Sequence, residues 1–144
     1  MKYMLLTYLD EKAWMSLSDA EKQELMAECA PHLDRLIATG AFLGGAPLHP
    51  TTAAATVRLR GSKPLVTDGP FAETREQVGG YTLIDAKDRD EAIAIAAGFL
   101  GSRSEVIIEV RQVVELKGLP AHPRAADELV IKNLTVKIEP NRDS

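Results

Sequence analysis

The chain has 144 residues and a mass of 15.7 kDa, a length typical of one domain with its own core. The formal net charge is −4 and no basic stripe is present, which argues against nucleic acid as a partner. One cysteine forms neither an internal disulfide nor a cysteine-based zinc site, which favours a reducing compartment. The N-terminal run is too short for a signal peptide, and no stretch reaches the roughly 18 apolar residues of a membrane helix. The composition predicts a cytoplasmic protein that binds no membrane.

The first half of the chain predicts a strand, a helix and then further strands. The run 2–9 is short, apolar and aromatic, as in a buried strand. Ser18 and Glu21 form a capping box, and the helix that it opens should end at Gly40. One side of this helix should face the sheet; it carries Leu25, Cys29, His32, Leu33 and Leu36.

The rest of the chain alternates strands with one more helix. A strand begins at 41–43, and the clean alternation over 51–60 predicts a hairpin with 63–68. A strand over 80–85 precedes a helix that Asp88 caps and Gly101 ends. Residues 106–114 form the last central strand.

The order β-α-β-(β)-β-α-β is the split βαβ pattern, so we expect an α+β ferredoxin-like fold. Helices then cover one face of an antiparallel sheet and leave the apolar side chains of 51–60, 80–85 and 106–114 uncovered, which predicts a homodimer. We expect this domain to span 1–115. Residues 116–144 should be a linker and an extra strand over 129–139, which extends the sheet edge or crosses to the neighbouring subunit.

The segment 66–80 (VTDGPFAETREQVGG) is a long, charged connection between strands, where sites tend to lie. Its motif DGPF, continued by AETREQ and GGY, resembles the signature of the DGPF branch of the YCII-related family. The opening KYMLLTY and the AIAIAA helix fit the same frame, and the resemblance covers roughly residues 1–115.

The resemblance implies a dimeric α/β barrel that associates through the open sheet face, related to small cofactor-free isomerases such as muconolactone isomerase. It also implies a histidine–aspartate pair as the active centre, here His32 and Asp68. Members of this branch tend to be encoded beside extracytoplasmic-function sigma factors, which implies a role in regulation.

The pair His32 and Asp68 has a chemical rationale and a structural alternative. Histidine titrates near neutral pH, and a carboxylate within about 4 Å would orient it as a general base and acid. Alternatively, His32 is a histidine at the core edge bonded to backbone, and Asp68 is a turn former, since Asp-Gly-Pro suits a tight turn. The two interpretations are compatible.

Three other side chains are candidates for ligand binding. Glu73 and Arg75 could bind a polar ligand or form a solvated face, and Tyr81 could place its hydroxyl in the cleft or be a packed aromatic. No histidine or cysteine has companions at metal-ligand spacing, so we expect no metal and no cofactor.

Two functions from different classes remain open. One is a cofactor-free acid–base enzyme acting on a small polar organic molecule. The other is a non-catalytic ligand-binding or regulatory module that works with a sigma factor.

Overall fold

The computed structural model describes residues 1–116, of which Met1–Val113 form one compact unit. The strand expected over 129–139 lies outside the described residues. No helix in the described part of the chain is both long and apolar enough to cross a membrane.

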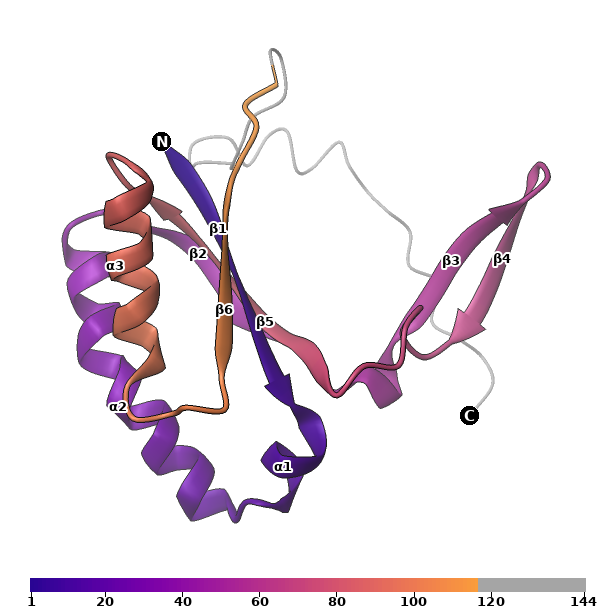
Figure 1. Ribbon diagram of the computed structural model, residues 1–144, viewed down its shortest axis with the longest axis horizontal. Helices are drawn as coiled ribbons and strands as arrows, with labels where there is room; N and C mark the ends of the chain where they lie inside the picture. Colours follow the sequence, from indigo (N-terminus) through magenta and orange to yellow (C-terminus); the bar gives the residue numbers. More distant parts are fainter. Residues whose placement is uncertain (117–144) are drawn as a thin grey trace. The chain divides into compact units, whose positions relative to one another are not determined.

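The main sheet has four antiparallel strands in the order β2-β5-β1-β6 (Figure 1). They are β1 (Lys2–Asp10), β2 (Phe42–Pro47), β5 (Glu76–Asp85) and β6 (Ile107–Gln112). The first and third strands of the split βαβ unit therefore lie at the centre and the other two at the edges. This order is the ferredoxin-like one, so the predicted α+β fold class is confirmed.

Two helices, α2 (Asp19–Ala38) and α3 (Arg89–Leu100), lie on the same face of this sheet (Figure 1). The capping box before α2 is formed, since Glu21 N–H donates to Ser18 Oγ at 3.2 Å and Ser18 N–H donates to Glu21 Oε2 at 2.7 Å. The Asp88 carboxylate caps α3 by accepting from the N–H of Glu91. Both predicted helix starts are confirmed.

The core lies between these helices and the sheet. Tyr3, Leu5 and Ile84 point to the helix side, because Tyr3 pairs with Ile84 in the register of β1 and β5. They pack with Leu36 of α2 and with Ala92, Ile95 and Ala96 of α3. The alternation of a strand therefore leaves the other face of the sheet to residues such as Met4 and Leu6.

The helix α1 (Glu11–Ser16) was not expected from the sequence. Asp10 caps it, since its Oδ1 accepts from the backbone N–H groups of Lys12 and Ala13 at 3.0 and 3.2 Å. Six residues make less than two turns, too short for an apolar period to emerge. The helix turns the chain from β1 towards α2.

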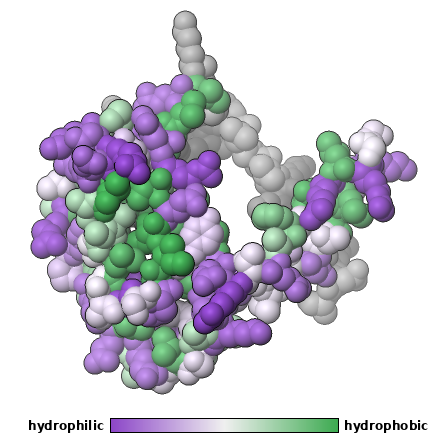
Figure 2. All heavy atoms as spheres, in the orientation of Figure 1, coloured by the Kyte–Doolittle hydropathy of each residue, from purple (hydrophilic) through white to green (hydrophobic). Residues whose placement is uncertain are grey.

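The expected hairpin is present, but it does not belong to the main sheet. β3 (Ala55–Arg60) and β4 (Lys63–Asp68) form a two-stranded sheet of their own, and 51–53, expected as strand, form a short 3₁₀ turn, η1 (Thr51–Ala53). The expectation that 51–60 adds to the apolar face of the main sheet is therefore wrong. Alternation predicts a strand with one apolar face, but it does not say which strand it pairs with. Apolar side chains of the hairpin are exposed (Figure 2).

Candidate functional site

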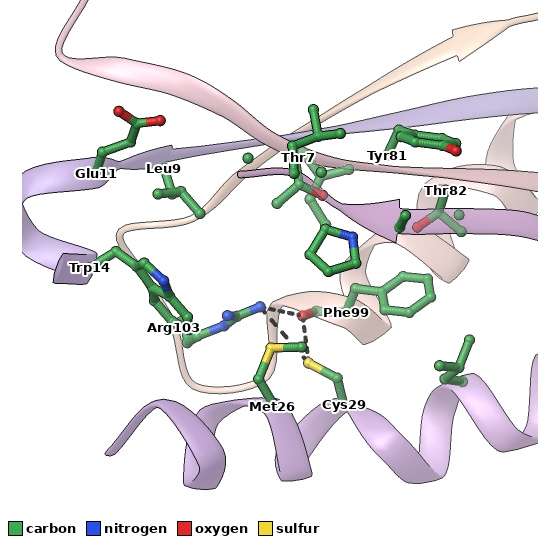
Figure 3. Close-up of a pocket in the computed structure, with 18 of the residues that line it drawn as sticks. Thr7, Leu9, Glu11, Trp14, Met26, Cys29, Tyr81, Thr82, Phe99 and Arg103 are labelled. Atoms are coloured by element: carbon green, nitrogen blue, oxygen red, sulfur yellow. Dashed lines mark hydrogen bonds between the residues drawn. The ribbon is translucent and has the colours of Figure 1, made fainter. Parts of the chain in front are cut away.

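A cleft with a volume of about 380 Å³ opens between the helix-side face of the main sheet and the helices α1 and α2 (Figure 3). The sheet supplies one wall, α2 and the end of α3 supply the opposite wall, and α1 lines one end. Its residues are therefore brought together from seven helices and strands of the fold.

Glycines on the sheet side of the cleft leave room that larger side chains would fill. Gly45 of β2 lies so close to β5 that a Cβ there would be 2.6 Å from the carbonyl oxygen of Tyr81. A bulge in the pairing of β1 with β5 leaves Gly79 without a partner, and Leu9 packs onto it. Thr7 and Leu9 are two residues apart on β1, so both side chains lie on the cleft side of that strand.

The opposite wall is an apolar strip of α2. Its members follow the helical spacing, so they share one side of the helix; they are Met26, Cys29, Ala30 and Leu33. Phe99 joins them from α3, and the Cys29 thiol donates to the Phe99 carbonyl oxygen at 3.2 Å. Met26 is half exposed, as is Met15 of α1, so the two thioethers lie at the border between cleft and solvent.

Trp14 and Glu11 line the cleft from α1. The Lys22 ammonium lies over the Trp14 ring, 5.9 Å from its centroid, which favours one orientation of the indole. Both carboxylate oxygens of Glu11 are engaged, because the backbone N–H and the hydroxyl of Thr51 donate to them at 2.8 and 2.6 Å. Glu11 thereby ties α1 to the turn that follows β2.

Arg103, just beyond α3, places its guanidinium in the cleft near Trp14, Met26 and Cys29 (Figure 3). Its Nη2 donates to the Phe99 carbonyl oxygen at 3.5 Å and to the Cys29 sulfur at 3.8 Å. Its Nε is buried and has no hydrogen-bond partner among the described residues. The cleft thus combines apolar walls with one positive group whose hydrogen-bonding capacity is largely unused.

The two residues expected as a catalytic pair lie in different surroundings. The His32 ring lies against α3: its Nε2 is 2.8 Å from the Ile95 carbonyl oxygen, and it meets Phe99 edge-on with centroids 4.7 Å apart. A carbonyl only accepts, so Nε2 carries the proton. Asp68 is exposed at the end of β4. Within residues 1–116, no histidine–carboxylate contact within 4.0 Å joins the two, and neither lines the cleft.

The residues after Asp68 form a turn. Gly69 has φ +89°, and its carbonyl oxygen accepts from the Thr56 hydroxyl at 2.8 Å. Its own N–H donates to the Ala54 carbonyl oxygen at 2.7 Å. The DGPF segment therefore closes the base of the hairpin, which agrees with the turn-forming interpretation of the motif.

Of the three ligand-binding candidates, Tyr81 borders the cleft from β5, whereas Glu73 and Arg75 do not. Tyr81 pairs with Leu6, so its side chain lies on the face of the sheet away from the helices and only its backbone faces the cleft. Arg75 is exposed and its Nε lies 3.5 Å from Asp10 Oδ2. The pKa of Asp10 is held below its ordinary value, chiefly because the Ala13 N–H donates to it and further because Arg75 is near. Arg75 thus supports the start of α1.

Sequence reasoning missed Arg103 and Trp14 as site residues. Arg103 follows the helix stop Gly101 in a short polar loop, where a lone basic residue carries no pattern. Trp14 is the single tryptophan of the chain. That rarity was the one available signal, since tryptophans are enriched at binding surfaces.

Two comparisons place the chain among known proteins. Residues 1–117 match the YCII-related domain. An uncharacterised protein of Rhizobium meliloti (strain 1021) is 40% identical over 96 residues, a stretch that makes up 67% of this chain and 77% of that protein. The family match over residues 1–117 extends through every strand and helix described above. The chain belongs to the YCII-related family.

Proposed function

We propose that this protein is a cofactor-free binding protein for a small organic molecule, which it holds in the cleft between the main sheet and α1 and α2. The cleft itself is the observation that carries the proposal. Its volume of about 380 Å³ falls in the range of roughly 300–1,000 Å³ that small-molecule sites occupy. Apolar walls with a few convergent polar groups are also what such sites provide.

Of the two functions left open by the sequence, the geometry favours binding over acid–base chemistry. The His32 Nε2–H is used by the Ile95 carbonyl oxygen, and Asp68 is exposed on the hairpin. Acid–base catalysis by this pair would require Asp68 to approach His32, and no contact of the described residues supports that approach. Assignment to the DGPF branch, and with it a regulatory role beside a sigma factor, is supported by the motif over 68–81 and the frame around it.

Filling the cleft tests the proposal. Ala30 lines the cleft on α2, whereas Ala27 is exposed on the same helix and does not line it, so Ala30→Phe and Ala27→Phe form a matched pair. We expect a fragment library to shift the amide resonances of Thr7, Gly80 and Thr82 in the wild type and in Ala27→Phe. We expect Ala30→Phe to abolish these shifts.

The opposite results are equally clear. Fragments that shift only residues outside the cleft, or that bind Ala30→Phe as well as the wild type, contradict the proposal. Circular dichroism of both variants checks that the helices are intact.

We further propose that a second copy of this chain covers the exposed hairpin, giving a homodimer. Val57, Leu59 and Val66 share one face of the hairpin, because Val57 pairs with Val66. They are 66, 74 and 61% exposed. A two-stranded hairpin is marginally stable alone and needs packing against further structure. This argument supports a partner with a matching apolar face, which a second copy supplies.

Charge placed on this face tests the dimer. We expect sedimentation or light scattering to give twice 15.7 kDa for the wild type and a shift to the monomer for Val57→Asp with Leu59→Asp. Arg58→Asp, on the other face of β3, should leave the mass unchanged. A wild-type mass of one chain at micromolar concentration contradicts the proposal.

A further inference from the structure

Two charged side chains, Glu11 and Arg103, line the cleft among residues 1–116, and only one of them has its charged oxygens or nitrogens fully hydrogen-bonded. The Glu11 carboxylate accepts two hydrogen bonds from Thr51. Arg103 has no carboxylate within 4.0 Å in the described part of the chain, where the ion pairs involve other groups. The unmatched charge in the cleft is therefore positive.

Helix capping accounts for only part of what Arg103 does. Its backbone N–H donates to the Leu100 carbonyl oxygen at 3.0 Å, and its Nη2 approaches the Phe99 carbonyl oxygen at 3.5 Å. Both contacts suit a residue at the end of α3. They leave the buried Nε without a partner. The two contacts of Nη2 are long, and the charge has no counterion within residues 1–116, so the guanidinium as a whole is incompletely satisfied. A partly buried cation of this kind is costly, so its placement is explained better by an anionic partner that arrives with the ligand.

The residues around the guanidinium indicate what the rest of the ligand should be. Met26, Cys29 and Phe99 lie beside Arg103, and Leu33 continues the apolar strip along α2. Figure 3 shows Arg103 on the helix side of the cleft, across from Thr7 and Thr82 of the sheet. A ligand that matches both features has one anionic group and an apolar body.

We propose that Arg103 binds the anionic group of a small amphipathic carboxylate whose apolar part packs along Met26, Leu33 and Phe99. This inference rests on the proposed function, because it names the class of molecule that the cleft binds. The planar guanidinium offers several donors in a fixed geometry that suits the two oxygens of a carboxylate. The apolar strip should contribute equally to the affinity of charged and uncharged ligands. Ligands of equal chain length should therefore differ in affinity only through the headgroup that Arg103 contacts.

The matched probes are octanoate and octanamide, which share chain length and shape but differ in charge. Trp14 is the single tryptophan and lines the cleft, so its fluorescence reports occupancy, and neither aliphatic probe absorbs where indole does. We expect wild-type protein to bind octanoate at least about tenfold more tightly than octanamide. Arg103→Met should remove this preference, and Arg103→Lys should retain part of it because the charge remains without the planar fork.

Arg89→Met is the matched control. Arg89 is exposed at the first residue of α3, whereas the cleft meets the other end of that helix at Phe99, roughly 15 Å along the axis. It should keep the full preference for octanoate. Circular dichroism and thermal unfolding confirm that each variant is folded before its binding is compared.

The outcomes separate the inference from the function on which it rests. Equal affinity for both probes in the wild type overturns the carboxylate inference and leaves cleft binding standing. Loss of the preference in Arg89→Met as much as in Arg103→Met overturns the assignment to Arg103. If neither probe changes Trp14 fluorescence, and the fragment library also leaves the cleft amides unshifted, the proposed function fails together with the inference.

Discussion

Replacing Gly98 with alanine tests how His32 is held between α2 and α3. Gly98 lies inside α3, and a Cβ at this position would be 2.3 Å from Cε1 of His32 and 2.5 Å from its Nε2. The imidazole would have to move away. It would lose its hydrogen bond to the Ile95 carbonyl oxygen (2.8 Å) and its edge-on contact with Phe99.

The expected magnitude follows from opposing terms. Alanine in a helix interior is favoured over glycine by about 1 kcal/mol. Against this gain, the lost hydrogen bond costs about 1 kcal/mol, and the lost ring contact costs about 0.5–1.5 kcal/mol. Gly98→Ala should therefore lower the free energy of unfolding by about 1 kcal/mol, which corresponds to a melting temperature about 4 °C lower for a domain of this size.

A double-mutant cycle with His32→Ala gives the decisive measurement. Once the ring is absent, Gly98→Ala should stabilise the protein by about 1 kcal/mol in urea denaturation, since only the helix preference remains. Ala97→Gly, at the exposed neighbouring position, measures that preference independently. If Gly98→Ala stabilises the wild type as much as it stabilises His32→Ala, the ring does not rest on Gly98 and the reasoning is refuted.

Three further predictions concern local features of the fold. Ser18→Ala removes the capping hydroxyl of α2 and should cost about 1 kcal/mol in urea denaturation; an unchanged midpoint would contradict this. The pKa of Glu21 lies below its ordinary 4.5 because the Ser18 backbone N–H and hydroxyl bond to its carboxylate. That stabilisation is present above about pH 4.5 and is lost as pH falls through the lowered pKa, so Glu21→Gln should flatten the decline of melting temperature between about pH 5 and 3. Gly45→Ala places a Cβ 2.6 Å from the Tyr81 carbonyl oxygen, so it should lower the melting temperature and weaken cleft binding together, and a loss of neither would show that β2 can shift freely.

The parts of the fold that the sequence predicted are those with local signals. The capping box at Ser18 and the cap at Asp88 mark helix starts through contacts within four residues, so no tertiary structure is needed to find them. Gly40 and Gly101 both adopt positive φ at the helix ends, a backbone conformation that favours glycine. The order of these elements was enough to predict the ferredoxin-like arrangement.

The cleft was not predictable in the same way, because its residues are assembled by packing. Trp14 and Arg103 are distant in sequence, and both line the cleft only because α1 places Trp14 there. This helix is too short to show an apolar period in the sequence. Tyr81, a candidate from the segment after the motif, borders the cleft, but its side chain lies on the other face of the sheet, beside Leu6. His32 lies on the expected apolar side of α2, but part of that side faces the cleft and part faces α3. Periodicity alone does not tell which residues of the side face the cleft.

The two methionines at the border of the cleft bear on how selective the site is. Met15 and Met26 are 59 and 52% exposed, so each side chain is free to change rotamer without disturbing the core. Unbranched thioethers repack readily around surfaces of different shape. Such an entrance adapts to the length and branching of its ligand, so affinity should change gradually along a homologous series instead of collapsing at one added carbon. Oxidation of either sulfur to the sulfoxide would make the same entrance polar, and it would thereby link ligand uptake to oxidative conditions.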